Sequence, residues 1–356
     1  MNQPTAFLED LLDAAGPSGF EVRPARVWRT EAETFADSVT TDVTGNTLAL
    51  LNPDGRPRVM MAGHIDEIGL QVTHIDERGI LYIAGIGGWD PQVLVGQRVR
   101  IMGRTGDVMG VVGKKAIHLI KGNERTKASE VAKLWVDVGV SSAEEAGELG
   151  LRVGDPLVID AQMVKLAGDR IASRAIDNRI GAYVVLEALR MLSESSPTAS
   201  AVAVATVQEE IGGKSGGGAS SSAFAIEPDV ALVVDVTFST DVPDVEKKEL
   251  GEHNLGGGPV LSRGSAAHPV VFDRLVEVAE AGGIPYTIQA QPRYTSTDAD
   301  SIYLSRGGVP TGLISVPNRY MHSPNEVVSL SDLDSTARLL AAFVQGLDGD
   351  TDFTPR

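Results

Sequence analysis

Two adjacent carboxylates, Glu209 and Glu210, directly follow a small, β-branched apolar run at 201–207. Such a run is typical of a buried strand, and Gly212-Gly213 breaks the pattern after the acids. Neighbouring side chains on an extended backbone point in opposite directions, so one carboxylate could bind a metal ion while the other faces a water molecule. A solvated glutamate pair at the start of a loop is the plain structural alternative.

Further acids and two histidines follow other apolar runs. They are His64 and Asp66 after 58–62, Asp177 after 171–176, Asp235 at the end of 230–234, and His322 shortly after 311–316. Because ligands bind open α/β sheets at the carboxyl ends of the strands, we expect these side chains to meet at one rim. Singly, each could be a capping acid, a loop acid or a buried histidine; together they form a ligand set for two divalent ions.

Carboxylate and imidazole ligands would accept Zn²⁺, and also Co²⁺ or Mn²⁺. Two such cations about 3.5–4 Å apart repel each other, so a shared carboxylate is expected between them. An acid left over beside a ligand would supply a general base, and Glu209 and Glu210 fit the base and ligand roles. Cysteine is absent from the sequence, which excludes disulfides, thiolate metal sites and cysteine nucleophiles.

Hydrophobic periodicity predicts the elements that position these residues. Helices are expected at 5–15, through 27–35, through 180–189, at 271–281, near 300 and from 331; strands are expected at 39–43, 47–51, 58–62, 201–207, 230–236, 286–289 and 311–316. This alternation predicts an α/β fold with a mostly parallel sheet sandwiched by helices.

Short β-branched runs separated by glycines dominate the stretch from about 71 to 166. They predict an inserted small β-barrel or PDZ-like domain. We therefore divide the chain into a first part of the catalytic domain (1–70), the inserted β domain (71–166) and a second part of the catalytic domain (167–356).

Three glycine motifs fail as alternative sites. A phosphate loop ending in Gly213-Lys214-Ser215 would need glycine at 208, which is Gln208. Gly85-Ile86-Gly87 has Asp90 where a dinucleotide fingerprint needs its third glycine. The stretch 213–217 matches the letters of a nucleophile elbow, but the expected strand ends at Val207, too early for the elbow's sharp turn.

Chain length, composition and net charge narrow the class of protein. The chain has 356 residues, 42% of them hydrophobic, which is enough for a large domain and a smaller one. A formal net charge of −17 argues against nucleic acid and anionic membranes as partners. We find no signal-peptide pattern at the N-terminus and expect a cytoplasmic protein.

The motifs together resemble the tetrahedral (TET) aminopeptidases, a family of dinuclear-metal peptidases that includes glutamyl and deblocking aminopeptidases. The resembling motifs are Gly16-Pro17-Ser18-Gly19-Phe20-Glu21, Gly63-His64-Ile65-Asp66-Glu67-Ile68-Gly69, Ser173-Arg174-Ala175-Ile176-Asp177-Asn178-Arg179, Val207-Gln208-Glu209-Glu210, Asp235, Thr297-Asp298-Ala299 and Met321-His322-Ser323-Pro324. They occur in the family's order and span nearly the whole chain.

The resemblance implies a role for each site residue. Asp177 would bridge the two metal ions, His64 and Asp235 would complete one metal site, and Glu210 and His322 would complete the other. Glu209 would be the general base, and Asp66 the carboxylate that fixes the tautomer of His64. The inserted domain would serve assembly, and dimers would build a hollow tetrahedral dodecamer.

One departure from the family is the glycine-rich loop 212–218, which replaces a loop with a bulky residue and an arginine. We expect this loop to be more flexible and to alter substrate preference without affecting the metal ligands.

The sequence thus predicts an aminopeptidase that hydrolyses N-terminal residues from peptides. A carboxypeptidase or an amide deacylase with the same metal site is the alternative. A metal-independent glycoside hydrolase using Glu209 and a second acid is less favoured, because aromatic residues are only 5% of the chain and the two histidines would have no role. A non-catalytic peptide-binding protein also stays open.

Overall fold

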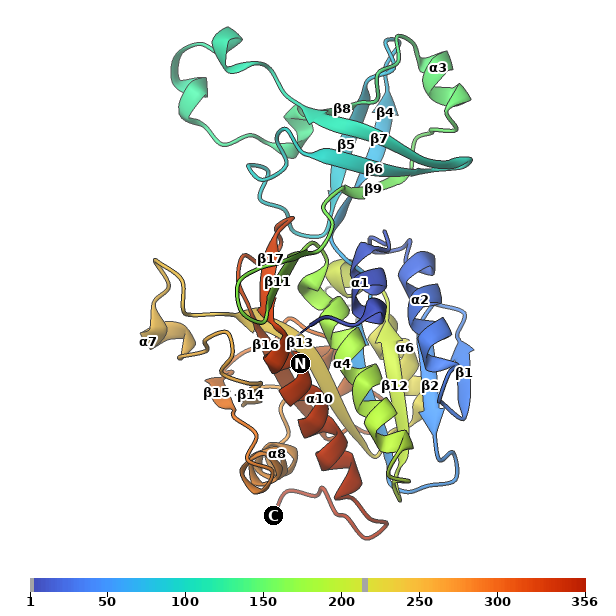
Figure 1. Ribbon diagram of the computed structural model, residues 1–356, viewed down its shortest axis with the longest axis vertical. Helices are drawn as coiled ribbons and strands as arrows, with labels where there is room; N and C mark the ends of the chain where they lie inside the picture. Colours follow the sequence, from blue (N-terminus) through green and yellow to red (C-terminus); the bar gives the residue numbers. More distant parts are fainter. Residues whose placement is uncertain (1–2, 213–216) are drawn as a thin grey trace.

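Eight strands form one large sheet in the computed structural model, which describes residues 3–212 and 217–356 (Figure 1). In sheet order these strands are β1 (Ser38–Thr41), β2 (Thr47–Leu51), β12 (Ser200–Thr206), β3 (Arg58–His64), β13 (Val230–Phe238), β16 (Thr311–Asn318), β14 (Val260–Arg263) and β15 (Thr287–Ala290). The central strands β12, β3, β13 and β16 run parallel, whereas the pairings β1 with β2, β2 with β12, and β14 with β16 are antiparallel. The predicted α/β sheet is confirmed, with its parallel part in the centre.

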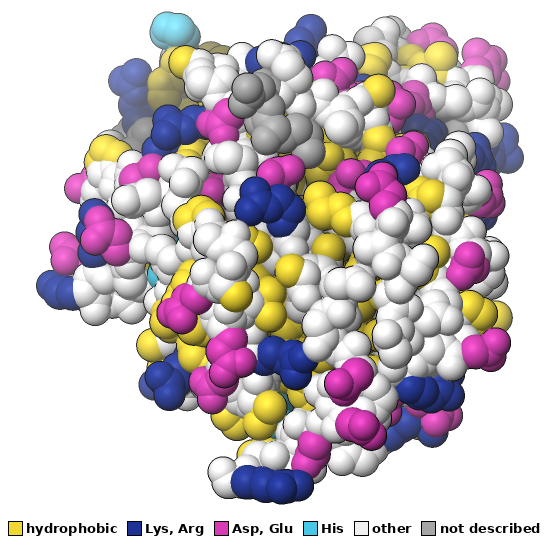
Figure 2. All heavy atoms as spheres, turned by 60° about the horizontal axis from the view of Figure 1, so that its bottom comes forward, with side chains coloured by type: hydrophobic (Ala, Val, Ile, Leu, Met, Phe, Trp, Pro, Cys, Tyr) yellow, Lys and Arg dark blue, Asp and Glu magenta, His cyan; other side chains and the backbone are white. Residues whose placement is uncertain are grey.

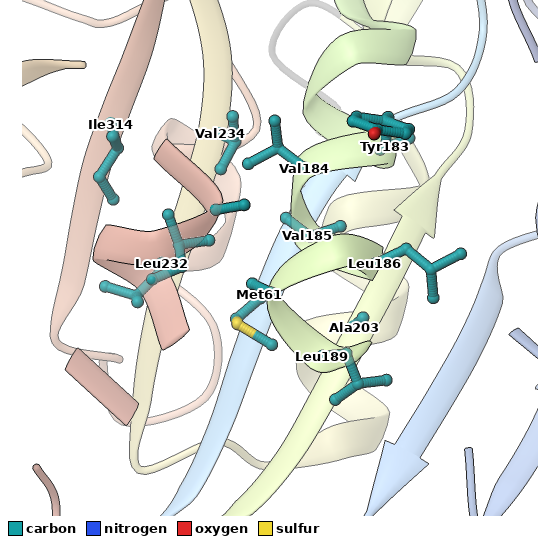
Figure 3. Close-up of a cluster of buried hydrophobic side chains, with 14 of the residues drawn as sticks. Met61, Tyr183, Val184, Val185, Leu186, Leu189, Ala203, Leu232, Val234 and Ile314 are labelled. Carbon is teal, nitrogen blue, oxygen red and sulfur yellow. The ribbon is translucent and has the colours of Figure 1, made fainter. Parts of the chain in front are cut away.

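Helices cover both faces of this sheet, as predicted. One face carries α1 (Ala6–Asp13), α2 (Val22–Ala32), α4 (Ile176–Ser193), α8 (Pro269–Ala281) and α10 (Leu330–Gln345); the other carries α6 (Gly217–Ile226) and α9 (Ala299–Ile302). Because side chains alternate along a strand, Met61 of β3 joins the first core and Met60 joins the second. In Figure 3, α4 lies along the first core with Val185 and Leu189 near the sheet.

Six further strands form a closed barrel with a core of its own. They are β4 (Gly69–Ile75), β5 (Leu81–Ile86), β6 (Arg98–Gly103), β7 (Gly106–Gly113), β8 (Trp135–Asp137) and β9 (Pro156–Ile159), accompanied by the short helix α3 (Ala143–Glu148) and the 3-10 turns Ile117–Leu119, Gly122–Thr126 and Val131–Lys133. The predicted β-barrel insertion is therefore confirmed. Figure 1 shows the barrel beyond the end of the sheet where β3 stops and the chain continues into β4.

A three-stranded sheet in the order β10-β11-β17 was not predicted. Its members are β10 (Val164–Lys165), β11 (Arg170–Ser173) and β17 (Glu326–Ser329); the short helices α5 (Glu209–Gly212) and α7 (Lys247–Leu250) were not predicted either. These elements have two to four residues each, which is too short for a periodic pattern. Asp177 therefore follows a strand of this small sheet and reaches the large sheet's rim from the first turn of α4.

A buried ion-pair cluster ties α1 to that rim. Arg179, which is fully buried, donates from Nη2 to Glu67 at 2.8 Å and from Nη1 to the carbonyl of Leu11 at 3.0 Å. Arg174 pairs with the same glutamate at 2.5 Å. Because both arginines flank Asp177 in the sequence, the cluster fixes the backbone on either side of that residue.

On the face shown in Figure 2, acidic side chains are interspersed with lysines and arginines. This face is therefore not uniformly basic, as expected of a chain with a net negative charge. No helix within the described ranges 3–212 and 217–356 is long and apolar enough to span a membrane.

Candidate active site

Parallel pairing brings the first site residues together at the carboxyl ends of neighbouring strands. His64 is the last residue of β3, and its register partner in β12 is Thr206, three residues before Glu209. On the other side of β3 lies β13, which carries Asp235 in its C-terminal half. Three separate segments therefore meet at one rim because of the strand register.

Asp177 and His322 enter the same rim from irregular backbone. Asp177 and Asn178 have non-helical dihedral angles inside α4 and share a cis peptide bond. His322 lies between β16 and β17 in the left-handed region, with φ of 60°. Both are held by Glu326, which accepts hydrogen bonds from the amide of Asp177 at 3.0 Å and from the amide of His322 at 2.9 Å.

Sequence reasoning missed Glu326. Its side chain is 2% exposed, and it begins the short buried strand β17. An acid at the head of an apolar run, four residues after a candidate ligand, is the signal that could have singled it out.

The gathered side chains form two clusters that share Asp177. We name His64, Asp177 and Asp235 the inner cluster, and Asp177, Glu210 and His322 the outer cluster. His64 Nε2 lies 3.3 Å from Asp177 Oδ1, and His322 Nε2 lies 3.3 Å from Asp177 Oδ2. In the inner cluster His64 Nε2 is 3.9 Å from Asp235 Oδ1; in the outer, His322 Nε2 is 3.3 Å from Glu210 Oε2.

Glu209 and Glu210 do not lie on an extended backbone, so the expectation that they point in opposite directions was wrong in its premise. Gln208 has φ of 62°, and a single helical turn, α5, begins at Glu209. Both carboxylates face the clusters: Glu209 Oε2 lies 3.8 Å from His64 Nε2, while Glu210 faces His322. Glu210 thus belongs to the outer cluster, while Glu209 lies beside the inner one without being part of it.

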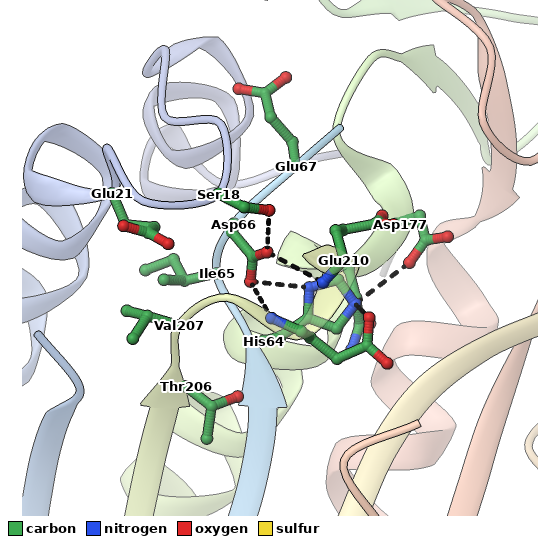
Figure 4. A network of polar contacts seen from close by, with 12 residues as sticks. Ser18, Glu21, His64, Ile65, Asp66, Glu67, Asp177, Thr206, Val207 and Glu210 are labelled. Atoms are coloured by element: carbon green, nitrogen blue, oxygen red, sulfur yellow. Dashed lines mark hydrogen bonds and ion pairs between the residues drawn. The ribbon is translucent and has the colours of Figure 1, made fainter. Parts of the chain in front are cut away.

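Asp66, which is fully buried, connects the inner cluster to the glutamates (Figure 4). Its Oδ1 lies 3.4 Å from His64 Nδ1, and its two oxygens accept the amides of Glu209 and Glu210, each at 3.2 Å. Ser18 donates to Oδ2 at 2.5 Å. One carboxylate therefore lies beside the imidazole and accepts the backbone amides of both glutamates.

Asn46 links Val207 and Gly218, which lie on either side of the two glutamates in the sequence. We call these two linked residues the neck of the glutamate segment. Its Oδ1 accepts the amide of Val207 at 3.1 Å, and its Nδ2 donates to the carbonyl of Gly218 at 3.0 Å. The amide of Gly218 in turn donates to the carbonyl of Val207 at 2.7 Å. Asn46 is fully buried, so these bonds form away from bulk water. The candidate phosphate loop and elbow at 213–216 lie outside the described residues.

Crowding of buried carboxylates perturbs the protonation of the whole site. Burial raises the pKa of Glu209 to about 10, and the charges of Asp235, Asp298 and Glu210 add to that effect while His64 opposes it. Burial also raises the pKa of Glu210 and of Asp235.

The pKa of Asp177, the residue that both clusters share, shifts in the opposite direction. Burial alone would raise the pKa of Asp177, but hydrogen bonds from His322 and His64 outweigh it and lower that pKa to about 2. The same contacts with Asp177 and Glu210 raise the pKa of His322 to about 11.

This donor set fits divalent cations. Four acids and two histidines converge, and imidazole and carboxylate are the ligands of zinc and its neighbours in the first transition row. Glu210 Oε1 is buried and has no hydrogen-bond partner among the described residues. A cation there would satisfy that oxygen and favour the ionised carboxylates that burial otherwise disfavours.

An α/β sheet whose carboxyl rim gathers these acids and histidines defines the chain as a candidate metallohydrolase. The chain belongs to the M42 glutamyl aminopeptidase family, whose model matches residues 45–339. It is accordingly an aminopeptidase, a hydrolase of peptide bonds.

Similar proteins support this membership. Lysyl aminopeptidase of Pyrococcus furiosus is 37% identical over 351 residues, which cover 98% of this chain and 99% of that protein. The TET aminopeptidase structure from a marine sediment archaeon, Thaumarchaeota archaeon SCGC AB-539-E09, has a TM-score of 0.90 at 35% identity and covers 96% of both chains. The TET1 peptidase of Pyrococcus horikoshii, described as assembling into a tetrahedron or a large octahedral shell, has a TM-score of 0.83 at 29% identity, with 96% of this chain and 99% of that chain covered.

A structure described as an endoglucanase from Thermotoga maritima shares the fold as well. It has a TM-score of 0.75 at 28% identity and covers 95% of this chain and 96% of that chain.

Proposed function

We propose that this chain is a dinuclear metal-dependent aminopeptidase that removes N-terminal residues from peptides with Glu209 as the general base. The observation that carries the proposal is the sharing of Asp177: its two carboxylate oxygens face two different histidines, His64 and His322, each at 3.3 Å. A carboxylate between two imidazoles is the arrangement that two neighbouring cations require.

The residues divide into two ligand sets. His64 and Asp235 would hold one ion, Glu210 and His322 would hold the other, and Asp177 would bridge them. When bound, the ions supply Lewis-acid polarisation of the scissile carbonyl and lower the pKa of a water molecule between them. Zn²⁺ is the first choice for this donor set, with Co²⁺ or Mn²⁺ as substitutes.

Glu209 performs the proton transfers. It belongs to neither cluster, yet its Oε2 lies only 3.8 Å from His64 Nε2, so it faces the reacting centre without being needed as a ligand. In this position it takes a proton from the attacking water and passes it to the leaving amine. Burial raises the pKa of this carboxyl group, which makes it a stronger base once a nearby cation has favoured its ionised form.

Asp66 keeps His64 ready to bind metal. With its proton on Nδ1, 3.4 Å from Asp66 Oδ1, His64 would keep the lone pair of Nε2 on the side of Asp177 and Asp235. The acidic surroundings would also attract the α-ammonium group of a peptide, which favours exopeptidase action.

The division at residues 1–70, 71–166 and 167–356 remains our proposal for the domains. We further propose that the inserted domain serves self-assembly and that dimers build a tetrahedral dodecamer, supported by the shells described for the TET1 peptidase of Pyrococcus horikoshii. Light scattering coupled to size exclusion tests the oligomeric state. A cytoplasmic location is likewise a prediction, testable by cell fractionation.

The decisive test is an assay on aminoacyl-anilides with wild type and Glu209→Gln, each before and after chelation and metal reloading. We expect chelation to abolish activity, and Glu209→Gln to lower kcat by about 10²–10⁴-fold while both ions still bind. Full activity in the Gln variant would refute the base assignment, and chelator-resistant hydrolysis would refute the metal centre.

The remaining alternative functions differ in whether they would use the two metal clusters. A carboxypeptidase or an amide deacylase would use the same clusters, and blocked peptides with free carboxyl ends distinguish these from an aminopeptidase. A glycoside hydrolase would pair Glu209 with a second acid and leave both histidines without a role. A non-catalytic peptide-binding protein would bind metal and peptide without hydrolysis. Oligosaccharide hydrolysis that resists chelators would favour the glycosidase.

A further inference from the structure

The loop that leaves β5 of the barrel, Gly87-Gly88-Trp89, reaches the outer cluster. His322 Nδ1 lies 2.8 Å from the carbonyl oxygen of Gly88, at hydrogen-bond distance. Trp89 donates from its indole nitrogen to the carbonyl of Gly69 at 2.7 Å, which anchors the loop to the start of the barrel. We call residues 87–89 the barrel loop.

The barrel loop also forms a wall of the pocket beside the outer cluster. That pocket is lined by Ile68, Trp89, Glu210, His322 and Pro324 together with other residues of the rim. Trp89 and Ile159 of the barrel therefore face the same small space as the loops and short elements at the rim of the large sheet.

The approach is so close that only glycine fits without movement. A Cβ atom on Gly87 would lie 2.6 Å from Ile68 Cγ2, and its φ of 75° is a conformation that other residues rarely adopt. A Cβ atom on Gly88 would lie 3.3 Å from His322 Nδ1. The segment that failed as a dinucleotide fingerprint thus uses its glycines to bring backbone against a candidate metal ligand.

A carbonyl oxygen can only accept a hydrogen bond, so Gly88 requires the proton of His322 on Nδ1. In the neutral imidazole, the form that binds metal, this leaves the lone pair on Nε2, the nitrogen that faces Asp177 and Glu210 at 3.3 Å each. In the inner cluster the nearest group to His64 Nδ1 named above is Asp66 Oδ1, at the longer distance of 3.4 Å. The two histidines are thus oriented by different parts of the molecule.

We infer that the barrel loop is a positioning segment for His322, so that the inserted barrel completes the outer metal site as well as any role it has in assembly. This inference rests on the proposed dinuclear function. Partners of metal-bound histidines typically change metal affinity by about 10–100-fold when they are altered. The barrel loop should therefore control the affinity of the outer site alone.

The test is a calorimetric titration of metal-free, full-length protein with Co²⁺, comparing wild type with Gly88→Ala and Trp89→Phe. Gly147→Ala in α3 of the same insertion is the matched control, since its added Cβ would meet no atom within 4 Å. We expect two binding steps in wild type and in the control. In Gly88→Ala the weaker step should lose about tenfold in affinity while the stronger step is unchanged. Trp89→Phe, which releases only the anchor, should show a smaller loss.

Three results would overturn the inference. Isotherms of Gly88→Ala and Trp89→Phe that superimpose on wild type would show that the loop does not orient His322. A loss of both steps together, with a lowered melting temperature, would show a general structural effect. A wild-type chain that binds fewer than two ions would overturn the proposed function as well, so the two failures are distinguishable.

Discussion

The inner and outer clusters share one carboxylate but are built in different ways. The side chains of His64 and Asp235 are 2% and 7% exposed and belong to the adjacent strands β3 and β13. The side chain of His322 is 32% exposed and comes from a connection with positive φ, while Glu210 lies in a single helical turn. The hydrogen-bond ladder of the sheet positions His64 and Asp235 directly.

The positions of Glu210 and His322 depend instead on side chains and backbone from other segments of the chain. Glu326 holds the amide of His322, Asp66 holds the amide of Glu210, and Gly88 faces the imidazole from the barrel. The positions of His64 and Asp235 are therefore determined by the fold of one sheet, whereas the positions of Glu210 and His322 are determined by packing between separate parts of the molecule. We expect the outer ion to bind more weakly and to exchange more readily.

The largest effect should come from the residue that the clusters share. Asp177→Ala removes a candidate ligand from both clusters and leaves His64 and His322 without the carboxylate that faces them. We expect fewer than two ions per chain by metal analysis and a loss of at least about 10³-fold in kcat/KM. Asp273→Ala, an exposed aspartate of α8, is the control and should retain two ions. Two ions in Asp177→Ala would refute the bridging role.

Removing one histidine at a time should separate the clusters. His322→Ala should lose the outer ion and keep the inner one, because the inner ligands are held by the sheet. His64→Ala should lose the inner ion and also leave Asp66, which is fully buried, without its imidazole partner, so the melting temperature should fall as well. Metal stoichiometry and thermal unfolding measure both effects. Equal losses of stability in the two variants would contradict the distinction.

The same distinction explains what could be predicted from the sequence. Apolar runs gave β3, β12 and β13, and the rule that ligands gather at the carboxyl ends of parallel strands then placed His64, Asp235 and the glutamates at one rim. Asp177 and His322 were singled out by residue type and motif, but their backbone conformations are irregular and no periodicity describes them.

What could not be predicted lies in contacts between distant segments. Glu326 and Asn46 each make two hydrogen bonds to backbone groups, and the carbonyl of Gly88 makes one to His322. Such contacts are fixed by tertiary packing, and a single sequence carries no local pattern for them. The helical turn at Glu209 was missed for the same reason, since Asp66 stabilises it from another strand's end.

A smaller effect should follow from loosening the neck of the glutamate segment. Asn46→Ala leaves the buried amide of Val207 without its acceptor and frees the carbonyl of Gly218. Losing such a buried hydrogen bond costs about 1–3 kcal/mol, so we expect kcat to fall about tenfold with little change in the inner ion's affinity. Val43→Ala, at a fully exposed position of the same turn, is the control. Wild-type kcat in Asn46→Ala would show that Asp66 alone suffices to hold the glutamates.

The smallest effect concerns the support beneath the His322 connection. Arg319, directly after β16, donates to Asp241 at 2.6 and 2.9 Å. Burial alone would raise the pKa of Asp241, but hydrogen bonds from Arg319 and Ser239 outweigh it and lower that pKa to about 2. Because the folded value lies below the usual value of 3.8, this pair stabilises the fold above about pH 4 and loses its effect as the pH falls towards 2.

Asp241→Asn should therefore be less stable than wild type by up to about 1 kcal/mol at pH 6, a modest figure because the pair is partly solvated. The difference in unfolding free energy should shrink towards zero near pH 2, where the wild-type carboxylate is itself becoming protonated. Urea unfolding at several pH values measures it, with the exposed Asp244→Asn as control. A difference that stays constant with pH would mean that packing, and not the ion pair, supports the outer cluster's connection.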